Sequence, residues 1–248
     1  MSNPTAIIII IGNEILSGRT QDKNLPWLAV ALGEIGVDVK CAYTIPDVAD
    51  DIIHYVNTAR SQADYVFTTG GIGPTHDDIT TLAVAAAFNV EVARHEEAER
   101  RLREYYSHDA EKLNAARLKM AGIPVGAELI DNPISAAPGF RLENVFVMAG
   151  IPSVMQAMFA HVKQYVKGGD PVQTVQLALW IGEGSIAAEI EAVQHQFPNI
   201  DIGVYPAMKE GRAHTTIVMR ATDAATLEKA VVACERFIHT RAIEIIKI

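Results

Sequence analysis

The sequence predicts an α/β protein with a mostly parallel sheet, covered on both faces by helices, and a second, smaller α+β domain. Strand patterns alternate with helical spacings from Ala6 to Val166, an order typical of repeated strand–helix–strand units. The segment Ala6–Ile11 is a continuous apolar, β-branched run, as expected for a strand buried on both faces. Lys167–Pro171 then combines flexible glycines with a stiff proline, which predicts a linker between domains at residues 1–167 and 171–248.

The elements of the first domain are predicted from hydrophobic periodicity, with glycines and prolines between them. After the first strand, strand patterns occupy residues 37–43, 65–69, 127–130 and 145–148. Helical spacing occupies residues 25–35, 47–60, 82–88 and 151–166. The charged stretch 96–120 predicts a helix with a break near residues 107–109, and turn-forming residues fill 131–140.

The second domain has a pattern of its own. Strands are predicted at residues 172–180, 200–205 and 215–220, and helices at residues 185–196 and 224–240. This β-α-β-β-α order is typical of a compact module with two layers.

Composition narrows the class of protein. The 248 residues carry 21 Lys and Arg against 30 Asp and Glu, and the net charge of −9 argues against a nucleic-acid partner. Cys41 and Cys234 form no C-x-x-C pair, which fits a reducing compartment. No segment has the length and hydropathy of a membrane span or a signal peptide. We therefore expect a cytoplasmic protein with no membrane partner and a small-molecule ligand.

The most informative motif is the turn Thr68–Thr80, which carries three glycines and a proline between a strand and a helix. Such a turn lets backbone N–H groups approach a ligand at the edge where parallel sheets bind ligands. It lacks the G-K-[ST] ending of a P-loop. It also lacks the G-x-G-x-x-G spacing of a dinucleotide fold, and it follows the third strand, not the first. The motif predicts a site for a phosphorylated ligand of another kind.

Carboxylates follow three of the predicted strands and are expected to converge at this edge. Glu14 follows the first strand, Asp47 the second, and Asp77 and Asp78 the third. Their oxygens suit a divalent cation such as Mg²⁺, Mn²⁺ or Co²⁺ bound to a pyrophosphate. Structural alternatives stay open: Asp47 and one of Asp77 and Asp78 are candidate helix N-caps, and Glu14 a solvated loop residue.

Other turns offer further walls for the same site. Asn132–Phe140 contains two prolines and small residues, and it is either a rigid wall for a flat ring or a plain surface loop. Gly150–Ser153 places a turn before a helix N-terminus, a position that favours anions. Asn24 either contributes to the site or merely starts the helix that follows it.

These motifs resemble those of the molybdopterin-binding (MoaB/Mog-like) domain, and most fully the N-terminal part of the competence/damage-inducible protein A (CinA) family. The resemblance covers about residues 5–165. Thr69–Thr80 resembles the domain's signature, and Ile11–Gly18 resembles the opening G-x-E-L-L-x-G of the CinA branch. Asn132–Phe140 resembles its N-P-x-G-x-A-P-G-F, and Ala149–Pro152 its P-G-x-P. Asn24 falls where that branch carries an asparagine.

The resemblance implies a three-layer α/β fold with a pterin or nucleotide at the glycine turn. It implies catalytic roles for Asp47 and Asp78, and metal binding by Asp47, Asp77 and Asp78. The implied ligand-binding residues come from the motifs above: Gly12, Glu14, Asn24, Thr69, Gly70, Gly71, Gly73, Pro74, Thr75, Asn132, Pro138, Gly139, Gly150 and Pro152.

The implied activity of the CinA branch is metal-dependent hydrolysis of a nucleotide pyrophosphate such as ADP-ribose, and related domains fused to FAD synthases act on FAD. One alternative is adenylylation of molybdopterin in molybdenum cofactor biosynthesis, and another is a non-catalytic module that binds a pterin or nucleotide. The resemblance also implies a homo-oligomer.

Two departures from the family pattern bear on these expectations. The module after Pro171 resembles the family's second domain, and we expect no C-terminal deamidase domain within the 248 residues. Ser135 and Ala149 replace a usual glycine and proline, which leaves the identity of the ligand open.

Overall fold

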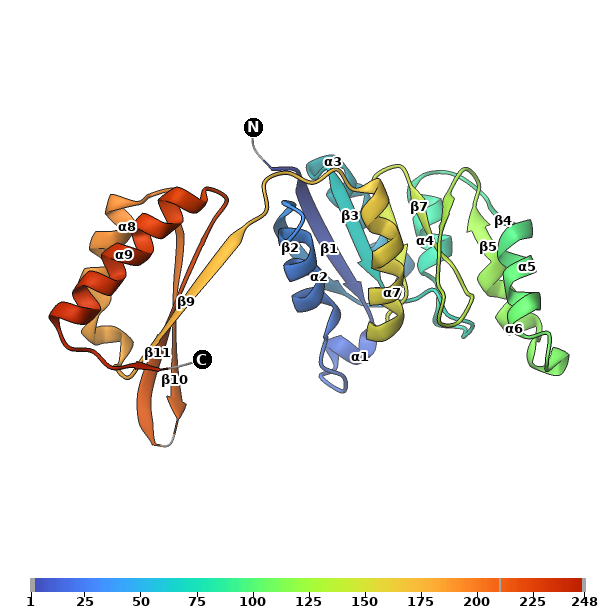
Figure 1. Cartoon of the computed structure of the whole chain (residues 1–248). Helices are drawn as coiled ribbons and strands as arrows, with labels where there is room; N and C mark the ends of the chain where they lie inside the picture. Colours follow the sequence, from blue (N-terminus) through green and yellow to red (C-terminus); the bar gives the residue numbers. More distant parts are fainter. Residues whose placement is uncertain (1–2, 210, 247–248) are drawn as a thin grey trace. The chain divides into compact units, whose positions relative to one another are not determined.

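The computed structural model describes residues 3–209 and 211–246, and within them the chain divides into two compact units. The division falls between Gly169 and Asp170 (Figure 1). No described helix is long and apolar enough to cross a membrane.

The first unit is built on a mostly parallel sheet with the strand order β2-β1-β3-β8-β7-β6. Its strands are β1 (Thr5–Ile11), β2 (Asp38–Ile45), β3 (Tyr65–Thr69), β6 (Glu128–Ile130), β7 (Gly139–Leu142) and β8 (Val145–Met148). The neighbours β2, β1, β3 and β8 are parallel, and β7 is antiparallel to both β8 and β6. Ile11 pairs with Ile45, Ile10 with Thr69, and Thr69 with Met148, so the carboxyl ends of four strands lie level.

Helices cover both faces of this sheet, which confirms the predicted three-layer fold (Figure 1). Helices α3 (Ala49–Gln62) and α4 (Thr80–Ala87) pack on the face that carries Ile7, Ile9 and Ile11. Helices α2 (Asn24–Gly33) and α7 (Pro152–Val162) cover the other face, where the Phe159 ring lies 5.5 Å from Trp27 and 6.0 Å from Phe67. The continuous apolar sequence of β1 therefore reflects burial on both sides.

Short elements complete the first unit: α1 (Asn13–Leu16), β4 (Val92–Arg94), α5 (Glu96–Tyr105), η1 (Ala110–Lys112), α6 (Ala115–Leu118), η2 (Lys119–Ala121), β5 (Gly122–Pro124) and η3 (Lys163–Tyr165). The charged stretch breaks after Tyr105, as predicted. The sequence did not predict β4 and β5, which pair antiparallel, or β7, which begins inside the stretch assigned to turns.

The second unit is an antiparallel sheet, in the order β10-β11-β9-β12, with two helices packed on it. Its elements are β9 (Gln173–Leu179), η4 (Glu183–Ser185), α8 (Ala187–Gln196), β10 (Asp201–Lys209), β11 (Arg212–Ala221), α9 (Ala224–Thr240) and β12 (Ile245–Ile246). Leu179, Ile217 and Met219 from the sheet meet Leu227 and Ile238 of α9 in its core. The predicted α+β class of the smaller domain is confirmed.

Candidate functional site

A cavity of about 630 Å³ lies at the carboxyl ends of the parallel strands, and we call it the strand-end cavity. The turns after β1, β2, β3 and β8 all contribute to its wall, as expected for an open parallel sheet. Most of the predicted site residues line it: Glu14, Asp47, Gly70, Gly71, Gly73, Pro74, Asp77, Asp78, Asn132, Gly150 and Pro152.

The remaining predicted residues lie elsewhere. Asn24 and Thr69 line a small cavity of about 60 Å³, which we call the side cavity. Gly12, Thr75, Pro138 and Gly139 line neither cavity. Gly139 has a structural reason to be glycine, because a Cβ there would lie 2.3 Å from the Val147 carbonyl oxygen.

The glycine turn is fixed by backbone packing on both sides. The Gly70 N–H donates to the Met148 carbonyl at 3.1 Å, and the Thr80 N–H donates to the Gly71 carbonyl at 2.9 Å. Gly70 and Gly71 have φ values of +107° and +70°. A Cβ at Gly70 would lie 2.1 Å from the Ile11 carbonyl oxygen, and one at Gly71 2.1 Å from the Thr80 hydroxyl. Only glycine satisfies both the conformation and the space.

Asp78 closes the turn and does not cap the following helix. Its Oδ2 accepts the Thr75 N–H at 2.8 Å and the Thr75 hydroxyl at 2.5 Å. The prediction that Asp77 or Asp78 is the N-cap was wrong, because α4 is preceded by Ile79 and has no side-chain cap. Asp78 lines the strand-end cavity as well.

Lys119 stabilises the same turn from a distant part of the chain. Its Nζ donates to the carbonyl oxygens of Thr75 and Asp78, each at 2.8 Å. No sequence pattern predicts this role, since Lys119 lies 41 residues beyond Asp78 in a stretch of ordinary helical charges.

Asp47 lies opposite this turn and is also not a helix cap. Its Oδ2 accepts the Asn13 N–H at 2.8 Å, while α3 begins at Ala49 with Val48 before it. Burial raises the pKa of the Asp47 carboxyl, and the charges of Glu14, Asp77 and Asp78 raise it further against the Asn13 hydrogen bond. The negative charges of Glu14, Asp77 and Asp78 therefore disfavour the ionised form of Asp47.

One cationic side chain lies among the residues that line the strand-end cavity. Arg117 is that residue, and its guanidinium carbon lies 4.9 Å from the ring centroid of Tyr106, another lining residue. An Arg117 nitrogen also donates to the Lys112 carbonyl. The sequence did not single out Arg117, because only the folding of residues 106–120 brings it to the cavity.

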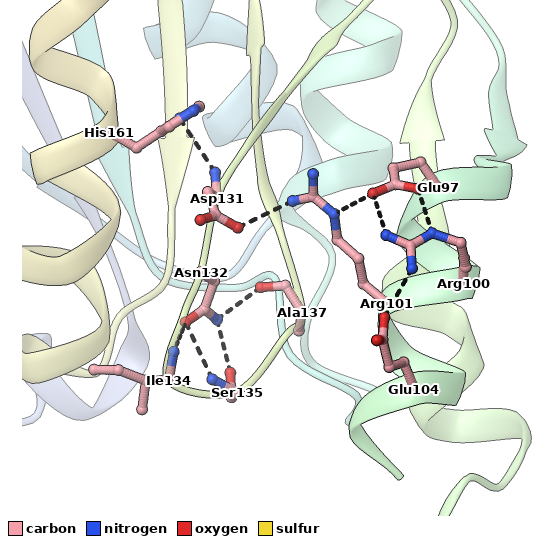
Figure 2. Close-up of polar contacts among 10 residues, drawn as sticks. All are labelled: Glu97, Arg100, Arg101, Glu104, Asp131, Asn132, Ile134, Ser135, Ala137 and His161. Carbon is pink, nitrogen blue, oxygen red and sulfur yellow. Dashed lines mark hydrogen bonds and ion pairs between the residues drawn. The ribbon is translucent and has the colours of Figure 1, made fainter. Parts of the chain in front are cut away.

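Asn132 organises the loop on the far wall. Figure 2 shows its Nδ2 donating to the Ser135 hydroxyl and the Ala137 carbonyl, each at 2.7 Å. Its Oδ1 accepts the N–H groups of Ile134 and Ser135 at 3.1 and 3.2 Å. The amide is thus used within the loop, and Ser135 and Ala137 form the surface that lines the cavity.

The loop is also tied to neighbouring helices (Figure 2). Asp131 pairs with Arg101 of α5 at 3.0 Å, and Arg101 bonds Glu97 at 2.7 Å. The Asp131 N–H donates to Nδ1 of His161 in α7 at 3.3 Å. These contacts hold the wall between α5 and α7.

The carboxylates do not form a metal centre by themselves. Among the residues that the structure describes, no three His, Cys, Asp or Glu side chains gather closely enough to hold an ion. Asp47, Asp77 and Asp78 nevertheless line one cavity and offer the hard oxygen donors that Mg²⁺ and Mn²⁺ prefer. Mg²⁺ is commonly bound by one or two carboxylates together with substrate phosphates, and this donor set fits that mode.

Comparisons with known proteins identify the family. Residues 7–168 match the probable molybdopterin binding domain, and residues 171–244 match the middle domain of FAD synthase. A protein of Pyrobaculum calidifontis is 36% identical over 212 residues, which is 82% of this chain and 81% of that protein.

Two relatives carry the CinA name. A CinA-like protein of Sulfurihydrogenibium sp. is 40% identical over 160 residues, 62% of this chain and 40% of that protein. The crystal structure of the protein CinA with unknown function from Thermoplasma acidophilum is 31% identical, with a TM-score of 0.60 over 65% of this chain and 98% of that one. The chain therefore belongs to the family of probable molybdopterin-binding domain proteins, as a CinA-like member.

Proposed function

We propose that this protein is a metal-dependent nucleotide pyrophosphohydrolase that acts on ADP-ribose, FAD or a similar phosphoanhydride. The observation that carries the proposal is the strand-end cavity, which is lined by the glycine turn with its Asp77 and Asp78, by Glu14 and Asp47 from neighbouring strand ends, and by Arg117. Its volume of about 630 Å³ lies within the range of small-molecule sites. The match of residues 171–244 to the middle domain of FAD synthase supports a nucleotide-related role.

The electrostatics of the cavity explain why a cation would accompany the substrate. Burial raises the pKa of Asp47, and the charges of Glu14, Asp77 and Asp78 raise it further. A pyrophosphate brings further negative charge, so its binding alone would increase the repulsion. Asp47, Asp78 and Asp77 would hold a divalent ion bound together with the phosphates, and its charge would offset this repulsion.

The chain's own groups then bind and orient the anhydride. N–H groups of the glycine turn donate to phosphate oxygens, and the Arg117 guanidinium supplies positive charge at the other wall. A bound cation would supply charge neutralisation and a lowered pKa for the attacking water. Water adds to one phosphorus, the bridging oxygen leaves with the other phosphate, and the water's proton passes to a carboxylate of the cavity.

A second reaction is favoured by the match of residues 7–168 to the molybdopterin binding domain. In it the same cavity holds molybdopterin, and the anhydride is made from ATP instead of cleaved. The loop of Asn132, rigid through its internal hydrogen bonds, suits a flat pterin ring. A non-catalytic pterin- or nucleotide-binding role would use the same walls.

The experiment is incubation of the purified protein with ADP-ribose, FAD and NAD in the presence of Mg²⁺, Mn²⁺ or Co²⁺. We expect release of AMP from at least one substrate. Release of AMP from none of them would overturn the hydrolase, and formation of adenylylated pterin from ATP and molybdopterin would establish the second reaction.

We further propose that the protein forms a homo-oligomer. The support for this proposal is the resemblance to the CinA family. Light scattering during size-exclusion chromatography measures this directly, and a single species at 26.9 kDa would contradict it.

A further inference from the structure

The side cavity adjoins the strand-end cavity and contains an unusual set of polar groups. The two share Ile11, Glu14, Thr20, Gly150 and Pro152, so a ligand in the larger one can extend a substituent into the smaller one. The side cavity measures about 60 Å³. A cavity of this size holds a few water molecules or a small polar substituent of a ligand.

Asn24 has a fixed orientation in the wall of this cavity. Its Nδ2 donates to the Gly150 carbonyl at 2.7 Å and to the Thr69 hydroxyl at 3.3 Å. The reverse orientation would place two carbonyl oxygens against each other, so the amide oxygen must point away from Gly150. Asn24 is 4% exposed, and its Oδ1 has no hydrogen-bond partner among the described residues.

Thr69 supplies the complementary group. Its hydroxyl oxygen accepts from Asn24, and no described residue accepts the hydroxyl proton in return. Thr69 is 1% exposed and lines the same cavity. One buried acceptor and one buried donor therefore lie side by side, and a buried polar group without a partner is costly.

We infer that the side cavity is a subsite for a sugar hydroxyl of the nucleotide ligand, which donates to Asn24 Oδ1 and accepts from Thr69 Oγ1. A hydroxyl is the group of suitable size that both donates and accepts. An amino group would leave the Thr69 proton unmatched, and an apolar substituent would leave both groups unmatched. This subsite rests on the proposed nucleotide-binding function, and it names a sugar hydroxyl as the group of the ligand that the protein recognises.

The experiment measures binding of ADP-ribose and its mono-deoxy analogues to the full chain by calorimetry, with Ca²⁺ in place of a catalytic metal. We expect one deoxy analogue to bind about 10- to 100-fold more weakly than ADP-ribose, while the others bind nearly as well. Thr69→Val should remove most of that difference, because the donor is gone. Thr68→Val is the matched control, since Thr68 is the neighbouring buried threonine of β3 and lines neither cavity.

The outcomes separate the two proposals. Equal affinities for ADP-ribose and every deoxy analogue would overturn the subsite alone, and the side cavity would then hold ordered water only. A preference that survives in Thr69→Val would also overturn it, and so would an equal loss of preference in Thr69→Val and Thr68→Val. No binding of ADP-ribose to the wild-type protein would overturn the subsite and the proposed substrate class together.

Discussion

Asp47 occupies a position that disfavours its charged form. Its partial burial raises its pKa, and three other carboxylates raise it further, although the Asn13 N–H supports its charge. Such a residue lowers the stability of the folded protein and is typical of functional sites. Asp78 differs, because its Oδ2 accepts two hydrogen bonds from Thr75.

The first prediction concerns stability and pH. A carboxyl whose pKa is raised on folding binds protons more tightly in the folded state, so its contribution to stability declines as pH rises through that pKa. The free energy of unfolding of the wild type, relative to Asp47→Asn, should therefore fall between acid and neutral pH. At neutral pH the variant should have a Tm equal to or above that of the wild type, since the amide oxygen can still accept from Asn13.

Urea unfolding of both proteins from pH 4 to 8 measures this difference. Asp50→Asn is the control, because Asp50 is exposed in the first turn of α3 and its substitution removes the same charge outside the cavity. A wild-type protein that gains stability relative to Asp47→Asn as pH rises would contradict a raised pKa of Asp47 in the folded state.

Among the individual residues of the site, those that directly follow strand ends could be predicted from the sequence. Those that reach the site only through tertiary contacts could not. Glu14, Asp47 and Asp78 could be placed at one edge because parallel strands end together. Arg117 and Lys119 could not, since the irregular chain of residues 106–121 brings them to the site through long-range contacts.

The glycine turn is the element on which the site depends. Its carbonyl and N–H groups bind to β8 and α4, and its φ values are positive. The Ile11 carbonyl and the Thr80 hydroxyl leave no room for a Cβ at Gly70 and Gly71. Rigid backbone of this kind can present N–H groups to an anion without rearrangement.

The second prediction separates conformation from crowding within this element. Gly71 and Gly18 have nearly the same φ, +70° and +71°, but a Cβ would lie 2.1 Å from the Thr80 hydroxyl at Gly71 and within 4 Å of nothing at Gly18. Gly18→Ala should cost about 1 kcal/mol in the free energy of unfolding, the penalty for a left-handed residue. Gly71→Ala should cost about 3 kcal/mol or more and weaken nucleotide binding at least tenfold.

Chemical denaturation and calorimetry of the two variants provide the measurement. Equal destabilisation by both substitutions would mean that the turn can yield around Thr80, and its rigidity would then not explain the site.

Element prediction succeeded where hydrophobic patterns are long and failed where strands are short. The run of β1 and the spacing of α3 and α9 are unambiguous. The strands β4 and β5 have three residues each, and β7 begins at a glycine within a proline-rich stretch. Such short strands form because they pair with neighbouring strands, and the local hydrophobic pattern of the sequence does not reveal this pairing.

At the scale of the whole molecule, the residues of both cavities belong to the unit before Gly169. That unit has its own sheet, helices and core, and the second unit has a separate core around Leu179 and Ile217. The linker pattern at Lys167–Pro171 was visible in the sequence because its glycines and proline interrupt all periodicity.

The third prediction is that residues 1–169 fold without the rest of the chain and keep the activity. The truncated protein should unfold cooperatively and release AMP at a rate within about threefold of the full chain, because domains with their own core fold as units. Residues 170–248 are the control and should show no turnover. A truncated protein that folds but does not bind or hydrolyse nucleotide would show that the second unit contributes to the site.

The proposed metal-dependent hydrolysis is tested most directly by AMP release from ADP-ribose. The wild type, Asp47→Asn, Asp78→Asn and Asp50→Asn are compared in the presence of the same divalent cation. We expect turnover by the wild type and Asp50→Asn, and a loss of at least about 100-fold in Asp47→Asn and Asp78→Asn, because their carboxylates would hold the cation. Turnover by Asp47→Asn and Asp78→Asn at the wild-type rate would contradict this expectation, and so would no AMP release by the wild type with Mg²⁺, Mn²⁺ and Co²⁺.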